Sequence, residues 1–316
     1  MQEDPQSGST RTLAHTPVLR DAVLNALAIR PDGAYLDATF GRGGHALEIL
    51  ARLDARGALL VLDRDPDAIA AAHRALGRDS RVRIAHAAFD RLGELAAPSS
   101  LAGALFDLGV SSPQLDDAAR GFSFLRDGPL DMRMDPGSGP SAAQFLARTS
   151  EREIAEVIRT LGEERFARRI AHAVVAARAA TPLTRTAQLA ALIASAVPGR
   201  EPGKHPATRT FQALRMQVND ELGQLERALP LALEALAPDG RLAVISFHSL
   251  EDRATKLFMR REASGDPAWR GLPNPPAAAR PRLAVLGKAL RADAEETARN
   301  PRARSATLRV ARRLAP

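Results

Sequence analysis

Short apolar runs, each followed by a polar or glycine residue, recur along the first third of the chain. Stretches with helical spacing separate them, as in 46–53 (ALEILARL). This alternation predicts a doubly wound α/β fold with parallel strands, whose polar residues gather at the carboxyl edge that binds ligands. The predicted strands are 35–37, 58–62, 82–87 and 102–106.

A long helical segment then interrupts the alternation. The next buried run, 241–247 (RLAVISF), follows a gap of about 130 residues, whereas a crossover between parallel strands needs only a few tens. The gap contains a Ser150–Glu153 capping box and apolar stripes that are typical of helices. The predicted helices run from 150 to an interruption at Gly162, and over 166–175, 187–197 and 209–236.

These patterns predict two domains. Residues 13–119 and 216–316 are expected to form the α/β domain, and 120–215 an inserted helical domain. A last strand at 306–311 is expected to complete the sheet, antiparallel at its edge. Residues 265–292 are rich in proline and arginine, so a surface loop is predicted there.

The segment 35–44 (YLDATFGRGG) joins the first strand to a glycine-rich turn that opens a helix. Gly41, Gly43 and Gly44 permit a tight turn and let backbone N–H groups approach a ligand. Asp63 ends the second strand, where such folds place a carboxylate against ribose hydroxyls. The combination predicts a nucleotide-cofactor site; the alternative is a tight turn that binds nothing.

Asp37 favours S-adenosylmethionine as the cofactor. A carboxylate directly before the loop repels the pyrophosphate of a dinucleotide, but it pairs well with the ammonium group of an amino-acid cofactor. We expect the adenine near Phe89 and Asp90, and the sulfonium near Asp107. An NAD-dependent dehydrogenase is the alternative; it would use the same loop and Asp63, but the sequence offers no evident His/Asp pair for hydride transfer.

Composition narrows the chemistry further. The chain has no cysteine, which excludes disulfides, iron–sulfur clusters, thiolate zinc sites and covalent thiol attack on a pyrimidine carbon. Its seven histidines show no HExxH-type pairing, so no metal site is expected. Residues 1–12 are polar and are expected to be a disordered tail, and no apolar run is long enough for a membrane span. We therefore expect a cytoplasmic protein.

Positive charge concentrates near the C-terminal end. Residues 277–316 carry ten Lys or Arg and three Asp or Glu, an excess that equals the net charge of the whole chain, +7. Such a segment is either a solvated surface or a contact for nucleic-acid phosphates. A non-catalytic RNA-binding assembly factor, which would use this segment alone, is a further alternative.

Eight segments in order resemble the ribosomal RNA small-subunit methyltransferase H family, also called MraW. They are 15–19 (HTPVL), 37–45 (DATFGRGGH), 107–116 (DLGVSSPQLD), 120–124 (RGFSF), 129–135 (PLDMRMD), 211–222 (FQALRMQVNDEL), 246–253 (SFHSLEDR) and 300–311 (NPRARSATLRVA). The resemblance covers nearly the whole chain and departs only conservatively, with Ala38 where a glycine and Ala46 where a serine is common.

The resemblance implies a class I, Rossmann-like methyltransferase that uses S-adenosylmethionine. Its implied substrate is a cytidine in the decoding region of bacterial 16S ribosomal RNA, methylated at N4, and its helical insertion is implied to help bind that substrate. Amino methyltransferases place the acceptor amine near the loop after the fourth strand, so Asp107 either orients the cofactor or takes a catalytic part. The implied cofactor positions are Gly43, Gly44, His45, Asp63, Phe89, Asp107 and Gln114.

Four further residues are candidates for substrate contacts, each with a structural alternative. Phe122 and Phe124 either stack on a base or pack in a hairpin. Arg133 either contacts RNA or pairs with Asp131. His248 follows the fifth buried strand at the ligand edge, where it either serves the site or caps the next helix.

Overall fold

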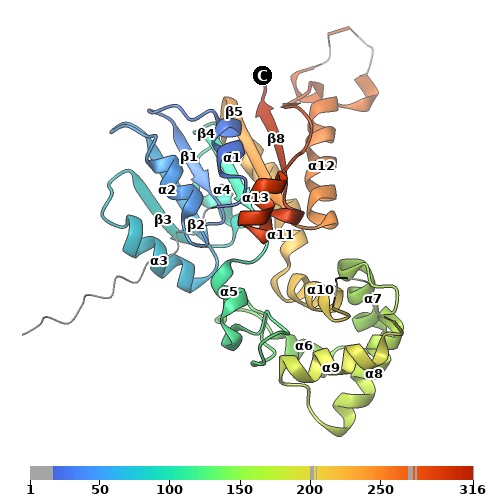
Figure 1. Cartoon of the computed structure of the whole chain (residues 1–316). Coiled ribbons are helices and arrows are strands. Elements are labelled where there is room, and N and C mark those ends of the chain that lie inside the picture. Colours follow the sequence, from blue (N-terminus) through green and yellow to red (C-terminus); the bar gives the residue numbers. More distant parts are fainter. Residues whose placement is uncertain (1–16, 200–202, 204, 270–272, 275, 316) are drawn as a thin grey trace, which may run out of the picture.

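The computed structural model describes residues 17–199, 203, 205–269, 273–274 and 276–315. They form a sheet with helices on both faces and a second group of helices beyond one end of the sheet (Figure 1). The predicted tail at 1–12 lies outside the described residues. No helix within the described part of the chain is both long enough and apolar enough to cross a membrane.

The described strands form one sheet with the order β3-β2-β1-β4-β5-β8-β6, and β7 also pairs with β8. The strands are β1 (Ala34–Asp37), β2 (Ala58–Asp63), β3 (Val82–His86), β4 (Leu101–Asp107), β5 (Leu236–Ser246), β6 (Leu283–Val285), β7 (Leu290–Arg291) and β8 (Thr307–Arg313). Strands β1 to β5 are parallel, whereas β8 is antiparallel to its neighbours. The predicted α/β class, the predicted strands and the antiparallel last strand are confirmed.

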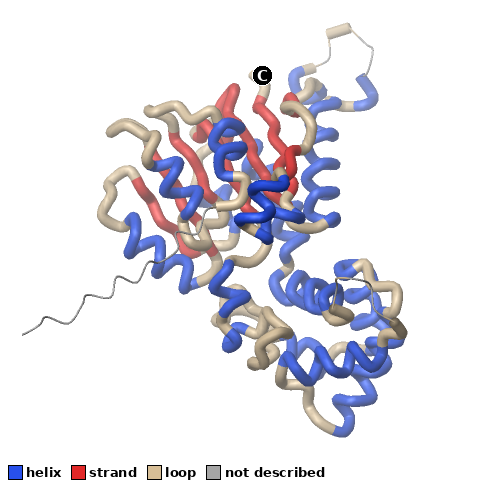
Figure 2. Tube along the Cα trace, viewed as in Figure 1, coloured by secondary structure: helices blue, strands red, loops and turns tan. Residues whose placement is uncertain are grey.

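Two layers of helices cover the sheet. One layer contains α1 (Arg20–Leu27), α2 (Gly44–Leu50) and α3 (Pro66–Leu76), and the other α4 (Leu92–Leu95), α11 (Glu221–Ala235) and α12 (Ser249–Ser264). In β2, Leu59 and Val61 face the first layer, whereas Leu60 and Leu62 face the second. This period of two is what a parallel sheet buried on both faces requires. Figure 2 shows the strands between the two layers.

Five of the described helices pack around a core of their own. They are α6 (Ala142–Arg148), α7 (Glu151–Gly162), α8 (Ala167–Ala180), α9 (Thr186–Ala196) and α10 (Thr208–Asn219). Their apolar faces meet in a cluster that includes Ile158 and Leu189 and is separate from both sheet cores. Ser150 caps α7, because its Oγ accepts the N–H of Glu153 at 3.3 Å. This group lies beyond the carboxyl ends of the parallel strands (Figure 1).

The single helix predicted over 209–236 is wrong. The structure has two helices, α10 and α11, separated at Asp220, whose φ of 48° is left-handed. The apolar stripe looks continuous in the sequence, but Phe211 faces the helical core and Leu225 faces the sheet core. Because the boundary predicted at 215 falls inside α10, we propose that the helical domain ends at Asp220 instead.

The surface loop predicted over 265–292 is only partly a loop. It contains β6 and β7, which both pair with β8, so β8 is not the edge strand. Arg282 anchors this region through ion pairs of 2.7 Å to Glu262 and 2.7 Å to Glu234. Strands of three and two residues are too short to give a readable alternation, which is why the pattern did not reveal them.

Candidate functional site

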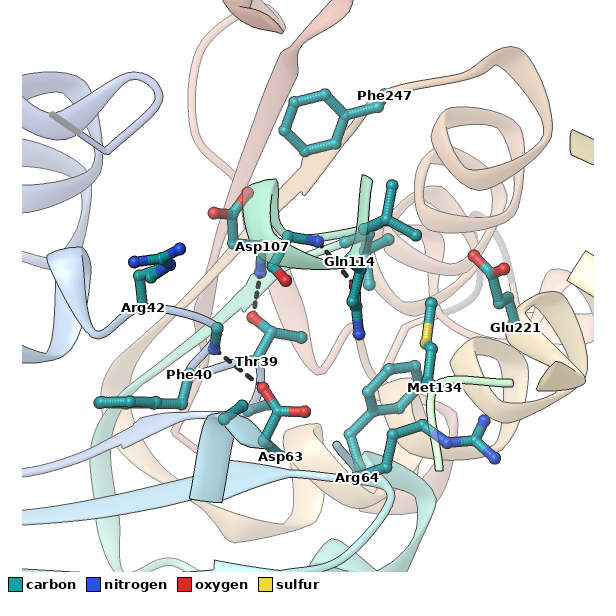
Figure 3. A pocket seen from close by; sticks show the side chains of 18 of the residues that line it. Thr39, Phe40, Arg42, Asp63, Arg64, Asp107, Gln114, Met134, Glu221 and Phe247 are labelled. Carbon is teal, nitrogen blue, oxygen red and sulfur yellow. Dashed lines mark hydrogen bonds between the residues drawn. The ribbon is translucent and has the colours of Figure 1, made fainter. Parts of the chain in front are cut away.

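A pocket of about 300 Å³ opens at the carboxyl ends of β1, β2 and β4 (Figure 3). The glycine loop, the segment after β4, the α10–α11 junction and the short 3₁₀ helix η5 (Pro301–Ser305) form its wall. Strand order reverses between β1 and β4, and open α/β sheets bind ligands at such a reversal. The predicted cofactor residues that line the pocket are Gly41, Gly44, His45, Asp63, Phe89, Asp107 and Gln114.

The glycine loop is tight, and glycine is required at its centre. Gly41 and Gly43 have φ values of 54° and 79°, in the left-handed region that favours glycine. A Cβ on Gly43 would lie 2.5 Å from a ring carbon of Phe40, and one on Gly44 would lie 3.1 Å from Pro17. The loop therefore closes against its own neighbours, and α2 begins directly after it at Gly44.

Asp63 braces this loop from the end of β2. Its Oδ2 accepts the N–H of Gly41 at 2.8 Å, and its Oδ1 accepts the N–H of Asp65 at 2.8 Å. Burial raises the pKa of Asp63 to about 6. The carboxylate thus lies in the pocket wall beside the glycine loop, and its predicted role with ribose hydroxyls stays a prediction.

Asp37 lies beneath the loop rather than among the residues that line the pocket. Its side chain is 1% exposed, and its Oδ1 accepts the N–H of Thr39 at 3.1 Å. Burial raises the pKa of Asp37 to about 7. Direct contact with the ammonium group of a cofactor stays a prediction, since Ala38 and Thr39 form the wall here.

Asp107 ends β4 and reaches into the pocket next to His45. Thr39 Oγ1 accepts the backbone N–H of Asp107 at 2.7 Å, which fixes the strand end (Figure 3). The Oδ1 of Asp107 and both ring nitrogens of His45 are buried without a hydrogen-bond partner among the described residues. Burial, followed by the charges of Asp37 and Glu251, raises the pKa of Asp107 to about 8. Unsatisfied buried polar atoms are costly, so these side chains are suited to a polar or charged ligand.

Phe89 lies in the pocket wall and packs edge-on against Phe106, with the ring centroids 5.8 Å apart. Its neighbour Asp90 turns away instead. Arg227 pairs with Asp90 at 2.9 Å and with Asp220 at 2.6 Å. Of the two residues expected near the adenine, Phe89 therefore lines the pocket, and Asp90 is engaged in an ion pair outside it.

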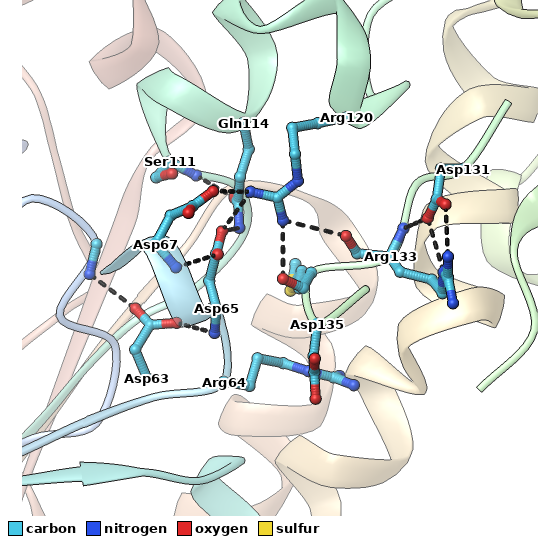
Figure 4. A network of polar contacts seen from close by, with 12 residues as sticks. Asp63, Arg64, Asp65, Asp67, Ser111, Gln114, Arg120, Asp131, Arg133 and Asp135 are labelled. Atoms are coloured by element: carbon cyan, nitrogen blue, oxygen red, sulfur yellow. Dashed lines mark hydrogen bonds and ion pairs between the residues drawn. The ribbon is translucent and has the colours of Figure 1, made fainter. Parts of the chain in front are cut away.

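Gln114 is held in a polar network that Figure 4 shows. It lies in α5 (Ser112–Asp116), the helix that follows β4. Its Oε1 accepts the N–H of Ser111 at 2.8 Å, and its Nε2 donates to Asp65 at 2.7 Å. Arg120 donates to Asp65 at 2.9 Å and to the carbonyl of Met134 at 2.8 Å. The network joins the end of β2 to the start of the helical insertion.

Asn219 makes the second connection between the two parts of the chain. Its Oδ1 accepts the N–H of Met134 at 2.8 Å, and its Nδ2 donates to the carbonyl of Met132 at 2.7 Å. Arg64, directly after β2, donates to the carbonyl of Asn219 at 2.6 Å. These bonds hold the α10–α11 break beside the pocket.

An ion pair from this break forms the far wall of the pocket. Arg215 donates two hydrogen bonds to Glu221, at 2.7 and 2.8 Å, and both side chains are largely buried. Glu251 lies nearby and accepts the N–H of Phe247 at 2.9 Å. His248 Nε2 lies 3.1 Å from a carboxylate oxygen of Glu251. Burial raises the pKa of Glu251, but nearby His248 and Arg215 and the N–H of Phe247 together lower it below its ordinary value.

Glu221, His248 and Glu251 offer ligand atoms within 4.8 Å of one another, which is close enough to hold a metal ion. Their partners argue against that use. Arg215 neutralises Glu221 with two bonds, and one oxygen of Glu251 is committed to a backbone N–H. The cluster therefore fits an internal network of ion pairs and hydrogen bonds better than a divalent cation.

The other predicted substrate residues lie outside the pocket wall. Phe122 is 6% exposed and belongs to the helical core. Phe124 stacks on His205 with the ring centroids 4.6 Å apart. Arg133 pairs with Asp131 at 2.7 Å. The structure thus places these three side chains in contacts within the protein, and their contact with RNA stays a prediction. His248 also lies outside the pocket wall, at the N-cap of α12.

Sequence reasoning missed several residues that the structure brings to the pocket. Arg215 and Glu221 belong to the segment 211–222, and Glu251 to 246–253, but their periodicity indicated only helix and strand ends. The sequence groups Arg302 with the basic C-terminal segment, which is expected to be a solvated surface or a phosphate contact, whereas Arg302 lines the pocket. No local signal marks them, because the chain turn at Asp220 brings Arg215 and Glu221 together.

Comparison with known proteins assigns the chain to a family. Residues 12–314 match the model of the MraW methylase family. The ribosomal RNA small subunit methyltransferase H of Halorhodospira halophila is 59% identical over 305 residues, covering 95% of this chain and 94% of that protein. The protein of the same name from Thiobacillus denitrificans is 58% identical over 306 residues, covering 96% of this chain and 98% of that protein.

Similarity to solved structures is weak by contrast. An rRNA methylase from Streptococcus thermophilus aligns over 94% of both chains with 10% identity and a TM-score of 0.42, which is too low to carry an argument. The sequence relatives are sufficient without it. Their identity and coverage, together with a family match that spans the sheet, the insertion and the C-terminal segment, show that this chain belongs to the MraW methylase family.

Proposed function

We propose that this methylase transfers a methyl group from S-adenosylmethionine to N4 of a cytidine in the decoding region of 16S ribosomal RNA. The observation that carries the proposal is the pocket at the strand reversal, in which Asp107 and His45 present buried polar atoms without partners. The curated relatives named ribosomal RNA small subunit methyltransferase H support the choice of substrate.

The residues of the pocket fit S-adenosylmethionine, which supplies an electrophilic methyl group on a sulfonium. Asp63 is proposed to accept hydrogen bonds from the ribose hydroxyls, and the ring of Phe89 to pack on the adenine. The buried carboxyl of Asp107 suits the positive end of this ligand, because an opposite charge compensates for its burial. In the same proposal the cofactor positions also include Asp37, Gly41, Gly43, Gly44, His45 and Gln114.

The acceptor amine sets two requirements on the protein. The lone pair of an exocyclic cytosine amine is delocalised into the ring, so the enzyme must hold the nitrogen in line with the methyl group. A nearby oxygen atom must also accept the proton that the amine loses. We assign this proton to Asp107, and we place the unstacked base between Asp107 and the wall that contains Arg215, Glu221 and Phe247.

Two earlier alternatives lose their support. Membership of a methylase family argues against the hypothesis of an NAD-dependent dehydrogenase. It also argues against the hypothesis of a non-catalytic assembly factor. Contact with RNA remains part of the proposal, through Phe122, Phe124 and Arg133 of the helical insertion and through His248 of the α/β domain. So does a cytoplasmic location, which suits a ribosomal substrate.

The decisive experiment identifies the product. Small subunits from a strain that lacks this activity would be incubated with the enzyme and methyl-labelled cofactor, and the RNA would be digested to nucleosides. We expect N4-methylcytidine, with tritium placed at C5 fully retained, because the chain has no cysteine for attack on the ring. If 5-methylcytidine or a 2′-O-methylated nucleoside were the enzyme-dependent, labelled product, the proposal would be overturned.

A further inference from the structure

Arg302 enters the pocket from the C-terminal end of the chain. It lies in η5, is half-buried, and lines the same pocket as the glycine loop. Its Nη1 donates to Ser112 Oγ at 2.5 Å, across 190 positions of sequence. Ser112 begins α5, directly after the loop that follows β4. The guanidinium is therefore fixed over the strand ends rather than extended into solvent.

Arg302 differs from two nearby arginines, Arg215 and Arg309, in the charge of its partner. Arg215 in the same pocket is neutralised by Glu221, and Arg309 in the same C-terminal segment pairs with Asp252 at 2.6 Å. No carboxylate among the described residues forms an ion pair with Arg302, whose guanidinium donates to the neutral hydroxyl of Ser112. Burial lowers the pKa of Arg302, with only the charge of Asp116 opposing it. A cation withdrawn from water without a counter-ion is unfavourable unless a ligand supplies the negative charge.

The position of Arg302 matches one end of the proposed cofactor. S-adenosylmethionine has one carboxylate, at its methionine end. If the adenosine end lies by Asp63 and Phe89, the methionine end lies by the glycine loop. A Cβ on Gly41 would lie 3.7 Å from the Cβ of Ser111. The neighbouring residue Ser112, which accepts the hydrogen bond from Arg302, therefore lies close to that loop. The buried acid Asp107 in the same pocket would repel a carboxylate that had no cation beside it.

We propose that the guanidinium of Arg302 binds the methionine carboxylate of S-adenosylmethionine, and that Ser112 orients the guanidinium for this contact. The inference rests on the proposed function for the identity of the cofactor. It gives the arginines of the basic C-terminal segment different roles. Arg302 then binds the cofactor, whereas the exposed neighbour Arg304 remains available for RNA. A planar guanidinium suits a carboxylate because it donates two parallel hydrogen bonds.

The test compares two ligands that differ only in the carboxylate. Calorimetry would measure S-adenosylmethionine and its decarboxylated analogue with the full-length protein and with Arg302→Gln. We expect the substitution to lower the affinity for S-adenosylmethionine by about ten- to a hundredfold, as for loss of a charge-assisted pair. Binding of the decarboxylated analogue should stay unchanged. Arg302→Lys should recover part of the lost affinity, because lysine restores the positive charge but not the two parallel hydrogen bonds of a guanidinium.

Two matched variants complete the design. Arg304→Gln removes an exposed arginine of the same segment, and Arg42→Gln an exposed arginine of the same pocket. Arg304→Gln should bind the two ligands as the unaltered protein does. Arg42→Gln tests a rival cation of the pocket, and it should leave the ratio of the two affinities unchanged because its guanidinium is not the partner of the carboxylate. A carboxylate-dependent loss with Arg42→Gln and not with Arg302→Gln would overturn the inference.

Three further outcomes would also overturn it. An equal loss for both ligands with Arg302→Gln, with a lowered melting temperature, would indicate a purely structural role. Unchanged cofactor affinity with weakened RNA binding would indicate a phosphate contact. If the unaltered protein bound neither ligand, the proposed function itself would fail, whereas the first two results leave that function intact.

Discussion

His45 Nε2 lies 3.8 Å from Oδ2 of Asp107 in the pocket, where the His45 side chain is 5% exposed and that of Asp107 is 26% exposed with its Oδ1 buried. Burial lowers the pKa of His45 to about 4 and raises that of Asp107 to about 8. Between these values both groups are neutral in the ligand-free protein. A cationic ligand would change this state, because an adjacent positive charge favours the ionised carboxylate.

Cofactor affinity should therefore increase with pH. Asp107 must lose a proton to face a sulfonium, so binding releases that proton. The binding constant should rise by up to about tenfold per pH unit from about pH 6 and level off above the pKa of about 8. His45 adds nothing in this range, since it is already neutral. Calorimetry in buffers of different ionisation enthalpy would measure the released proton directly.

The control for this pH dependence is a pair of variants. Asp107→Asn should weaken binding and flatten the upper part of the pH profile, whereas Asp32→Asn, at an exposed position before β1, should preserve both. An affinity that does not change with pH in the unaltered protein would contradict the assignment of Asp107 to the cationic end of the ligand.

The ligand-free protein should become less stable as pH rises. Asp37 has a pKa of about 7 in the folded state, whereas the ordinary pKa of an aspartate side chain is 3.8. The folded state thus holds this proton more tightly, and the free energy of unfolding falls between these two pH values by at most about 4 kcal/mol. Urea denaturation of Asp37→Asn at pH 5 and at pH 8 should show a smaller difference than that of the unaltered protein. An equal difference in both proteins would refute the prediction.

Gly43→Ala should destabilise the protein and abolish cofactor binding. The substitution adds left-handed backbone strain of about 1 kcal/mol, and its Cβ would lie 2.5 Å from the Phe40 ring. Gly139→Ala is the matched control, because Gly139 has a φ of 69° but no atom within 4 Å of a Cβ. Thermal unfolding should show the smaller loss for Gly139→Ala, with cofactor affinity kept. Equal losses would mean that backbone strain alone explains the effect.

The sheet was accessible from the sequence because its signals are local. Each parallel strand is a short apolar run that ends at a polar residue, and glycines mark the turn after β1. The same local signals placed Asp63 and Asp107 at the carboxyl edge, and the family resemblance added Gln114. The structure brings all three into one pocket.

The rest of the site depends on contacts between distant segments. The pair of Arg215 and Glu221 exists because the chain turns at Asp220. Asn and Asp tolerate such a left-handed turn, but the apolar stripe runs across Asn219 and Asp220 without interruption and hides it. Arg302 reaches the pocket only because η5 packs beside α5. A basic composition alone could not distinguish this arginine from Arg304, which is exposed two positions later.

The buried pair of Arg215 and Glu221 should behave as a unit. Arg215→Met leaves the carboxylate of Glu221 buried and unpaired, which should cost about 3–5 kcal/mol of unfolding free energy. Replacing both side chains by Met removes the unpaired charge, so the double variant should be more stable than Arg215→Met alone. Urea denaturation of the two single variants and the double variant would give the coupling energy.

Methyl transfer should be lost in all three with cofactor binding retained, because the pair faces the proposed base. Strictly additive stability losses, or loss of cofactor binding in the stable double variant, would show that the pair serves the cofactor pocket in another way.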